Sequence, residues 1–101
     1  MESAYTAAMD LQALPGGDLV DRGLRDLSTG DLTADALLVL IGAPRLRMLG
    51  LTVPDSAIAG YPEDRLYELL ARPDQDSAHS RYNALVRRLV SFERALACVR
   101  R

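Results

Sequence analysis

Apolar residues recur at alternating steps of four and three along the last quarter of the chain, residues 77–101. This spacing places them on one side of a helix, and no glycine or proline interrupts the segment. At about 1.5 Å per residue, such a helix is about 37 Å long, which is enough to span a small domain. The pattern therefore predicts a long C-terminal helix as the main support of the fold. Its predicted inward stripe consists of Ala78, Tyr82, Leu85, Leu89, Phe92, Leu96 and Val99.

The rest of the chain shows the same helical periodicity, divided by capping residues, glycines and prolines. Within the predicted helix 34–41, residues 36–41 are apolar all round, which is typical of a helix buried on most sides. Gly42, Ala43 and Pro44 are expected to end it. The sequence thus predicts one all-α domain over residues 1–101, a bundle of four to five helices. The predicted helical segments lie near residues 3–14, 18–28, 34–41, 44–49, 62–72 and 77–100.

Two packing contacts follow from these helices. Gly23 lies in the apolar stripe of segment 18–28, where its missing side chain is expected to let another helix approach closely. The long C-terminal helix is expected to pack against the apolar segment Leu37–Ile41.

The apolar arc of the C-terminal helix is broader than a coiled-coil seam. Val86, Val90 and Ala97 widen it on one side, as is typical of a helix packed into a globular core. We therefore expect this helix to pack mainly on its own domain. Its extra width and length would also suit the face of a homodimer.

The composition fits a globular, non-membrane protein. Hydrophobic residues make up 49% and charged residues 26%, so the chain has enough apolar material for a core. The longest apolar run, residues 36–43, is far shorter than the ~20 residues of a membrane span. One cysteine cannot form an internal disulfide, and Glu2 and Asp10 interrupt any N-terminal apolar run. We therefore expect a cytoplasmic protein of bacterial type.

Charge is distributed unevenly along the chain. Residues 1–76 carry a balance of −7 and residues 77–101 a balance of +5, and all twelve basic residues are arginine. A row of arginines along one side of the last helix could follow a phosphate backbone, which makes a nucleic-acid-binding regulator an alternative function. The simpler interpretation is that these arginines offset the acidic remainder of the domain. They are Arg81, Arg87, Arg88, Arg94 and Arg101, and they form the candidate interaction surface.

A small enzyme is a second alternative. Asp76, His79 and Ser80 lie close together in sequence and contain the residue types of a catalytic triad, but residues of this kind also cap the first turn of a helix. His79 and Cys98 are placed near opposite ends of one helix, so they cannot share a metal ion. No phosphate-binding or metal-binding motif occurs, and we expect no cofactor, no metal site and no catalytic residue.

A helix-turn-helix over residues 33–51 is suggested only weakly. Its predicted turn, residues 42–44, has a suitable length, but the second helix would be two turns long and would offer only Arg45 and Arg47 to a base edge. At the start of that short helix the two arginines could also hold an anion. The function that the sequence favours is a non-enzymatic protein–protein interaction or regulatory module, able to form a homodimer and with no membrane partner.

Overall fold

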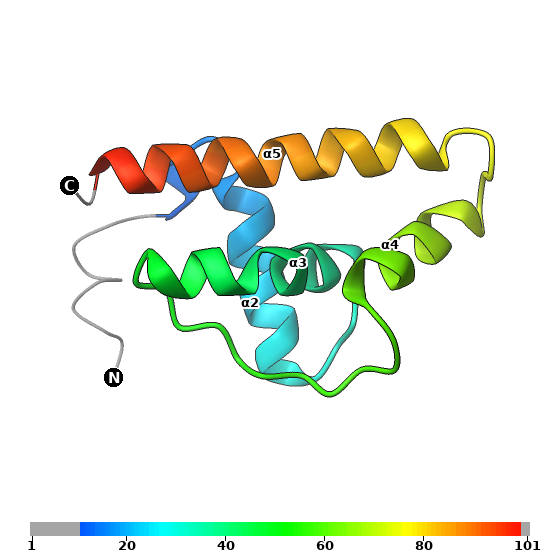
Figure 1. Ribbon diagram of the computed structural model, residues 1–101, viewed down its shortest axis with the longest axis horizontal. Coiled ribbons are helices and arrows are strands. Elements are labelled where there is room, and N and C mark those ends of the chain that lie inside the picture. Colours follow the sequence, from blue (N-terminus) through cyan, green and yellow to red (C-terminus); the bar gives the residue numbers. More distant parts are fainter. Residues whose placement is uncertain (1–10, 100–101) are drawn as a thin grey trace.

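The computed structural model of the 101-residue chain describes residues 11–99, which form helices joined by turns and one longer irregular segment (Figure 1). No strand occurs within residues 11–99, so the all-α prediction is confirmed. The helix predicted at 3–14 falls mainly outside the described residues, and its last part forms a single 3₁₀ turn. The elements are η1 (Leu11–Ala13), α2 (Gly17–Thr29), α3 (Ala34–Met48), α4 (Pro62–Ala71) and α5 (Ala78–Val99).

Three helix boundaries lie where the capping residues predict them. Gly30 ends α2 in the left-handed conformation, with φ of 85°, and its N–H donates to the carbonyls of Asp26 and Leu27. The Thr33 hydroxyl accepts a 3.2 Å hydrogen bond from the Ala36 N–H at the start of α3. Pro62 is the first residue of α4, where its missing N–H costs nothing.

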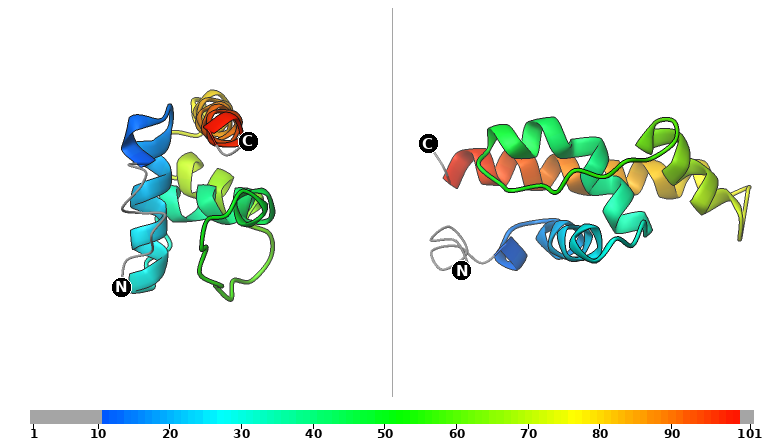
Figure 2. Two further views of the ribbon diagram at one scale, coloured as in Figure 1. Left: turned by 90° about the vertical axis from the view of Figure 1, so that its left-hand side faces the viewer. Right: turned by 90° about the horizontal axis from the view of Figure 1, so that it is seen from below.

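The predicted break at Gly42, Ala43 and Pro44 is wrong, because α3 continues through it to Met48. Proline removes one backbone hydrogen bond and crowds the preceding turn, which bends a helix more readily than it ends one when both halves are packed. Figure 2 shows the two halves of α3 running in different directions. Buried side chains hold each half, including Leu38 before the bend and Leu46 after it.

The helices cross one another and are not arranged as a simple bundle. α5 extends along α3 and α4, and α4 runs in the opposite direction to α5 (Figure 1). α2 lies behind them and stands across α5 in both figures (Figure 2). An Arg22–Asp35 ion pair of 3.0 Å joins α2 to α3. The number of helices in residues 11–99 agrees with the predicted four to five. The predicted bundle arrangement is not confirmed, because α2 crosses α5.

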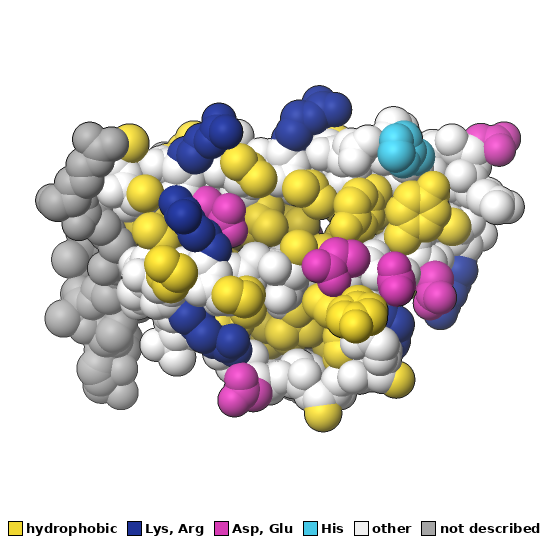
Figure 3. All heavy atoms as spheres, viewed as in Figure 1, with side chains coloured by type: hydrophobic (Ala, Val, Ile, Leu, Met, Phe, Trp, Pro, Cys, Tyr) yellow, Lys and Arg dark blue, Asp and Glu magenta, His cyan; other side chains and the backbone are white. Residues whose placement is uncertain are grey.

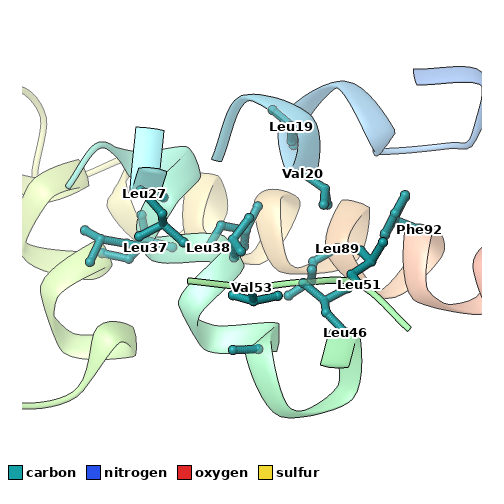
Figure 4. Packing of buried hydrophobic residues seen from close by; sticks show 14 of the residues in the cluster. Leu19, Val20, Leu27, Leu37, Leu38, Leu46, Leu51, Val53, Leu89 and Phe92 are labelled. Carbon is teal, nitrogen blue, oxygen red and sulfur yellow. The ribbon is translucent and has the colours of Figure 1, made fainter. Parts of the chain in front are cut away.

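One hydrophobic core connects all four α-helices. Leucine, valine and phenylalanine side chains from α2, α3 and α5 pack along the interior between these helices (Figure 4). The irregular segment between α3 and α4 contributes Leu51 and Val53, which are 4% and 6% exposed. The predicted packing of α5 near residues 37–41 is confirmed, since Leu37, Leu38 and Val39 are buried in the same cluster as Leu89.

Gly23 marks the closest approach of α2 to α3. A Cβ atom at this position would overlap the Asp35 carbonyl and the Val39 side chain. The two backbones approach this closely because residue 23 carries no side chain. The close helix contact expected at Gly23 is thus confirmed.

Candidate interaction surface

The inward side of α5 is largely the stripe that the four-three spacing predicts. Ala78, Leu89, Phe92 and Leu96 are buried, and Tyr82 and Leu85 are half-buried against the core. Val99 differs, because its side chain is 54% exposed. It lies in the last turn of α5, where the neighbouring helices no longer cover the stripe.

Arg88 belongs to the contact between α5 and α2. Its guanidinium Nη2 donates a 2.8 Å hydrogen bond to Asp18 Oδ1 and forms an ion pair with it. Gly16, just before α2, lies against the Arg88 carbonyl so closely that a Cβ atom would overlap it. The arginine therefore meets the acidic part of the domain in the way the charge balance predicts.

The other arginines of the predicted row differ from Arg88. Arg81, Arg87 and Arg94 are exposed, and none forms an ion pair with another residue in the range 11–99. Arg101 lies outside the described residues. The structure therefore separates the row into one paired arginine and three free ones, and nucleic-acid binding by these residues stays a prediction.

The residues of the suggested catalytic group make local contacts around the start of α5. The Asp76 N–H donates to Asp74 Oδ1 at 3.1 Å, and the Ser80 hydroxyl donates to the Ser77 carbonyl at 3.1 Å. The His79 ring is 3.2 Å from the Asn83 side-chain amide, one turn along the helix. Within the described part of the chain, no side-chain hydrogen bond joins Asp76, His79 and Ser80 to one another. These contacts are those expected of helix-capping and surface residues.

The anion site suggested for Arg45 and Arg47 is placed differently by the structure. Both lie in the last turn of α3, where the helix dipole favours basic side chains. No new helix starts at residue 44, so the two arginines are not at a helix N-terminus that could hold an anion. This also removes the turn of the suggested helix-turn-helix. Arg47 Nη2 instead donates to the Val53 carbonyl at 2.9 Å and to Asp55 Oδ1 at 3.1 Å. It thereby ties the irregular segment to α3.

A shallow pocket of about 270 Å³ lies beside this Arg47–Asp55 pair. Leu40, Pro44 and Ile58 are among its apolar walls, and the start of α4 closes one side at Pro62. In Figure 3 hydrophobic side chains are visible below α3, on the side of the irregular segment.

A strip of apolar side chains that are partly open to solvent runs along α5 and continues onto α4. Val86, Val90 and Ala97 are half-buried and lie on the same side of α5 as His79, since steps of 7, 11 and 18 residues return to one face. Figure 3 shows the histidine at this face, with hydrophobic side chains along the helix beside it. We call the following residues the apolar strip: Tyr67, Tyr82, Val86, Val90 and Ala97.

Two tyrosines form one end of the apolar strip. The ring centres of Tyr67 on α4 and Tyr82 on α5 are 5.8 Å apart, with the rings tilted by 52°. Burial is the main cause that raises the pKa of the Tyr82 hydroxyl, and the negative charges of Glu63 and Asp64 raise it further. The acidic first turn of α4 therefore lies beside this end of the strip.

Glu93 lies on the same face of α5 as the apolar strip, between Val90 and Ala97, and faces α3. A Cβ atom at Gly42 would be 3.0 Å from Glu93 Oε2, so the carboxylate lies directly over this glycine. Partial burial raises the pKa of Glu93, and the positive charge of Arg45 opposes the rise. The acid is thus more easily protonated in the folded chain than in the unfolded one.

A pH-dependent contribution to stability follows from Glu93. A raised folded-state pKa means that the folded chain binds more protons, so this residue's contribution falls as the pH rises from the unfolded value of 4.5 through the higher folded value. Glu93→Gln is therefore expected to stabilise the protein relative to wild type more at neutral pH than below pH 4.5. Urea unfolding of both proteins across this range measures the difference. A difference that stays constant with pH would contradict the assignment.

Two searches of the described residues give negative findings. In residues 11–99, no group of three or more His, Cys, Asp or Glu side chains is placed to hold a metal ion. No helix in the same range has the length and apolar character needed to cross a membrane.

Comparison with models of protein families, with curated proteins and with solved structures gives no match for this chain.

Proposed function

We propose that this protein is a non-enzymatic protein–protein interaction module, acting as an adaptor or regulator through the apolar strip. The observation that carries the proposal is the position of the strip. It is continuous with the core at Tyr82 and Val86, yet these side chains stay partly open to solvent. An apolar surface with few charged residues inside it and others around it is typical of a protein-binding site.

Charges around the apolar strip support a protein partner over nucleic acid. Glu63 and Asp64 lie beside Tyr82, where they would repel a phosphate backbone. The charge of Arg88 is already balanced by Asp18. The exposed single cysteine, Cys98, suits a reducing compartment, and we propose that the module acts in a bacterial cytoplasm.

Site-specific photo-crosslinking in cells tests this function. A photoreactive residue in place of Val90 is expected to give a discrete protein adduct on irradiation, because a bound partner would lie against the strip. The same photoreactive residue in place of Ala84 provides the matched control, since Ala84 is exposed on the opposite side of α5. Finding no adduct from Val90, or equal adducts from both positions, would reject the strip as a binding surface.

The arginine alternative makes a separate prediction. Replacing Arg81 and Arg87, which lie off the strip, with glutamine is expected to leave the adduct from Val90 unaffected if the strip binds the partner. A nucleic-acid binder would instead lose salt-dependent affinity for DNA or RNA in this double variant. Fluorescence anisotropy with labelled oligonucleotides at two salt concentrations distinguishes the two functions.

A further inference from the structure

The two ends of the apolar strip carry opposite charge. At the N-terminal end of α5, the acidic residues of α4 lie beside Tyr82, and Figure 3 shows acidic side chains gathered over α4. Toward the C-terminal end, Arg94 is exposed, with no ion pair to another described residue. Arg45 on α3 lies near Glu93 at this end, so two arginines outnumber the one carboxylate there. In Figure 3, basic side chains lie over this half of α5 and over α3. The surface is therefore complementary to itself when its direction is reversed.

We propose that the apolar strip is covered by a second copy of this chain, docked with its α5 antiparallel about a two-fold axis perpendicular to the helix. This proposal rests on the proposed function and names the partner of the same surface. A two-fold axis along α5 would bring like charges together. An axis across α5 brings the basic end of each copy onto the acidic end of the other.

The spacing of the strip residues sets the register of this dimer. The axis crosses α5 at the level of residue 88, so strip residues whose numbers lie equally far above and below 88 face each other across the interface. Val86 then meets the partner's Val90, and Tyr82 meets the partner's Arg94. The guanidinium reaches the tyrosine ring and the nearby carboxylates of Glu63 and Asp64, a combination of cation–π contact and ion pairing. Each contact occurs twice because the arrangement is symmetric.

The outline of the molecule leaves room for a stable dimer interface on this face. Viewed as in Figure 3, the described molecule measures 41 × 25 Å, an outline of about 1,000 Å². A stable interface typically buries about 800 Å² on each partner. The face is thus large enough for an antiparallel dimer with the apolar strip at its centre and charged residues at its rim.

Charge reversal at the two ends provides the test. One variant carries Arg94→Glu, and a second carries Glu63→Arg with Asp64→Arg. Each variant alone would place like charges together twice, whereas a 1:1 mixture would restore both attractions in a heterodimer. Arg81→Glu is the matched control, because Arg81 is also exposed and unpaired but lies on the other side of α5.

Sedimentation equilibrium under reducing conditions measures the outcome. We expect wild type and Arg81→Glu to reach twice the 11.0 kDa chain mass at about 100 μM, as a Kd in the micromolar range requires. Each end-reversed variant is expected to weaken self-association at least about tenfold, and the mixture to recover it. Circular dichroism checks that each variant is helical, and recovery in the mixture itself shows that both are folded.

Two results would overturn the dimer. One is a wild-type protein that stays at the chain mass at about 100 μM. The other is a mixture that associates no better than its separate components. In either case, a Val90 adduct to a different protein would leave the proposed interaction function in place. A wild-type dimer with no Val90 adduct would place self-association on another surface and reject the strip.

Discussion

Replacing Phe92 with alanine is expected to lower the free energy of unfolding by about 3–5 kcal/mol. Phe92 is fully buried on α5 and is among the largest such side chains of the core. Figure 4 shows it beside Leu89, in the same cluster of buried side chains that α2 and α3 contribute to. Its removal would leave a cavity where α5 meets the other helices, because close-packed neighbours fill such a space only in part.

Ser91→Ala is the matched control for Phe92→Ala. Ser91 is the preceding residue of the same helix and is exposed, so its replacement is expected to change stability by less than about 0.5 kcal/mol. Chemical unfolding in urea compares both variants with wild type. A loss at Phe92 as small as that at Ser91 would mean that the inward side of α5 is wrongly placed.

Replacing Gly23 with alanine is expected to destabilise the protein by about 1–3 kcal/mol. A loss of stability is informative here, because replacing a glycine inside a helix with alanine usually raises the free energy of unfolding by about 0.5–1 kcal/mol. The new methyl group would overlap the Asp35 backbone carbonyl and the Val39 side chain, so α2 and α3 would have to move apart. Thermal or urea unfolding measures the change.

Gly42→Ala is the matched control for Gly23→Ala, because Gly42 is also buried within a helix. Its added Cβ would be 3.0 Å from Glu93 Oε2 and from the ends of the Leu89 side chain. These side-chain ends can move, whereas the Asp35 carbonyl is fixed in a helix. We expect a smaller loss at Gly42. Equal losses, or a gain at Gly23, would contradict the close contact between α2 and α3.

The sequence predicts the helices well where local signals decide them. Glycine and threonine caps define the boundary between α2 and α3, and Pro62 defines the start of α4. The long periodic pattern predicts α5 almost to its observed ends. Local hydrogen bonding and backbone conformation control these features, so a short stretch of sequence is enough.

The continuation of α3 through Pro44 could not be predicted in this way. Proline and Gly42 both disfavour a helix interior, and locally they indicate a break. Packing outweighs that preference, because Leu46 and Ala43 are buried against the rest of the core and hold the second half of the helix. The crossing of α2 over α5 has the same origin in long-range contacts, including the one at Gly16.

The candidate surface was partly predictable from sequence. The widening of the α5 stripe by Val86 and Val90 is visible in the spacing, and both residues are half-buried in the structure. The pairing of Arg88 with Asp18 spans 70 positions, so periodicity could not reveal it. The same holds for the acidic residues beside Tyr82, which come from a different helix.

The most direct test of the central claim is to map the adduct formed by a photoreactive residue at Val90. If a second copy of the chain covers the apolar strip, the adduct is expected to have twice the chain mass. Mass spectrometry of its peptides is expected to place the attachment near residue 86 of the other chain. An irradiated protein that forms no adduct, either purified or in cells, would contradict the account.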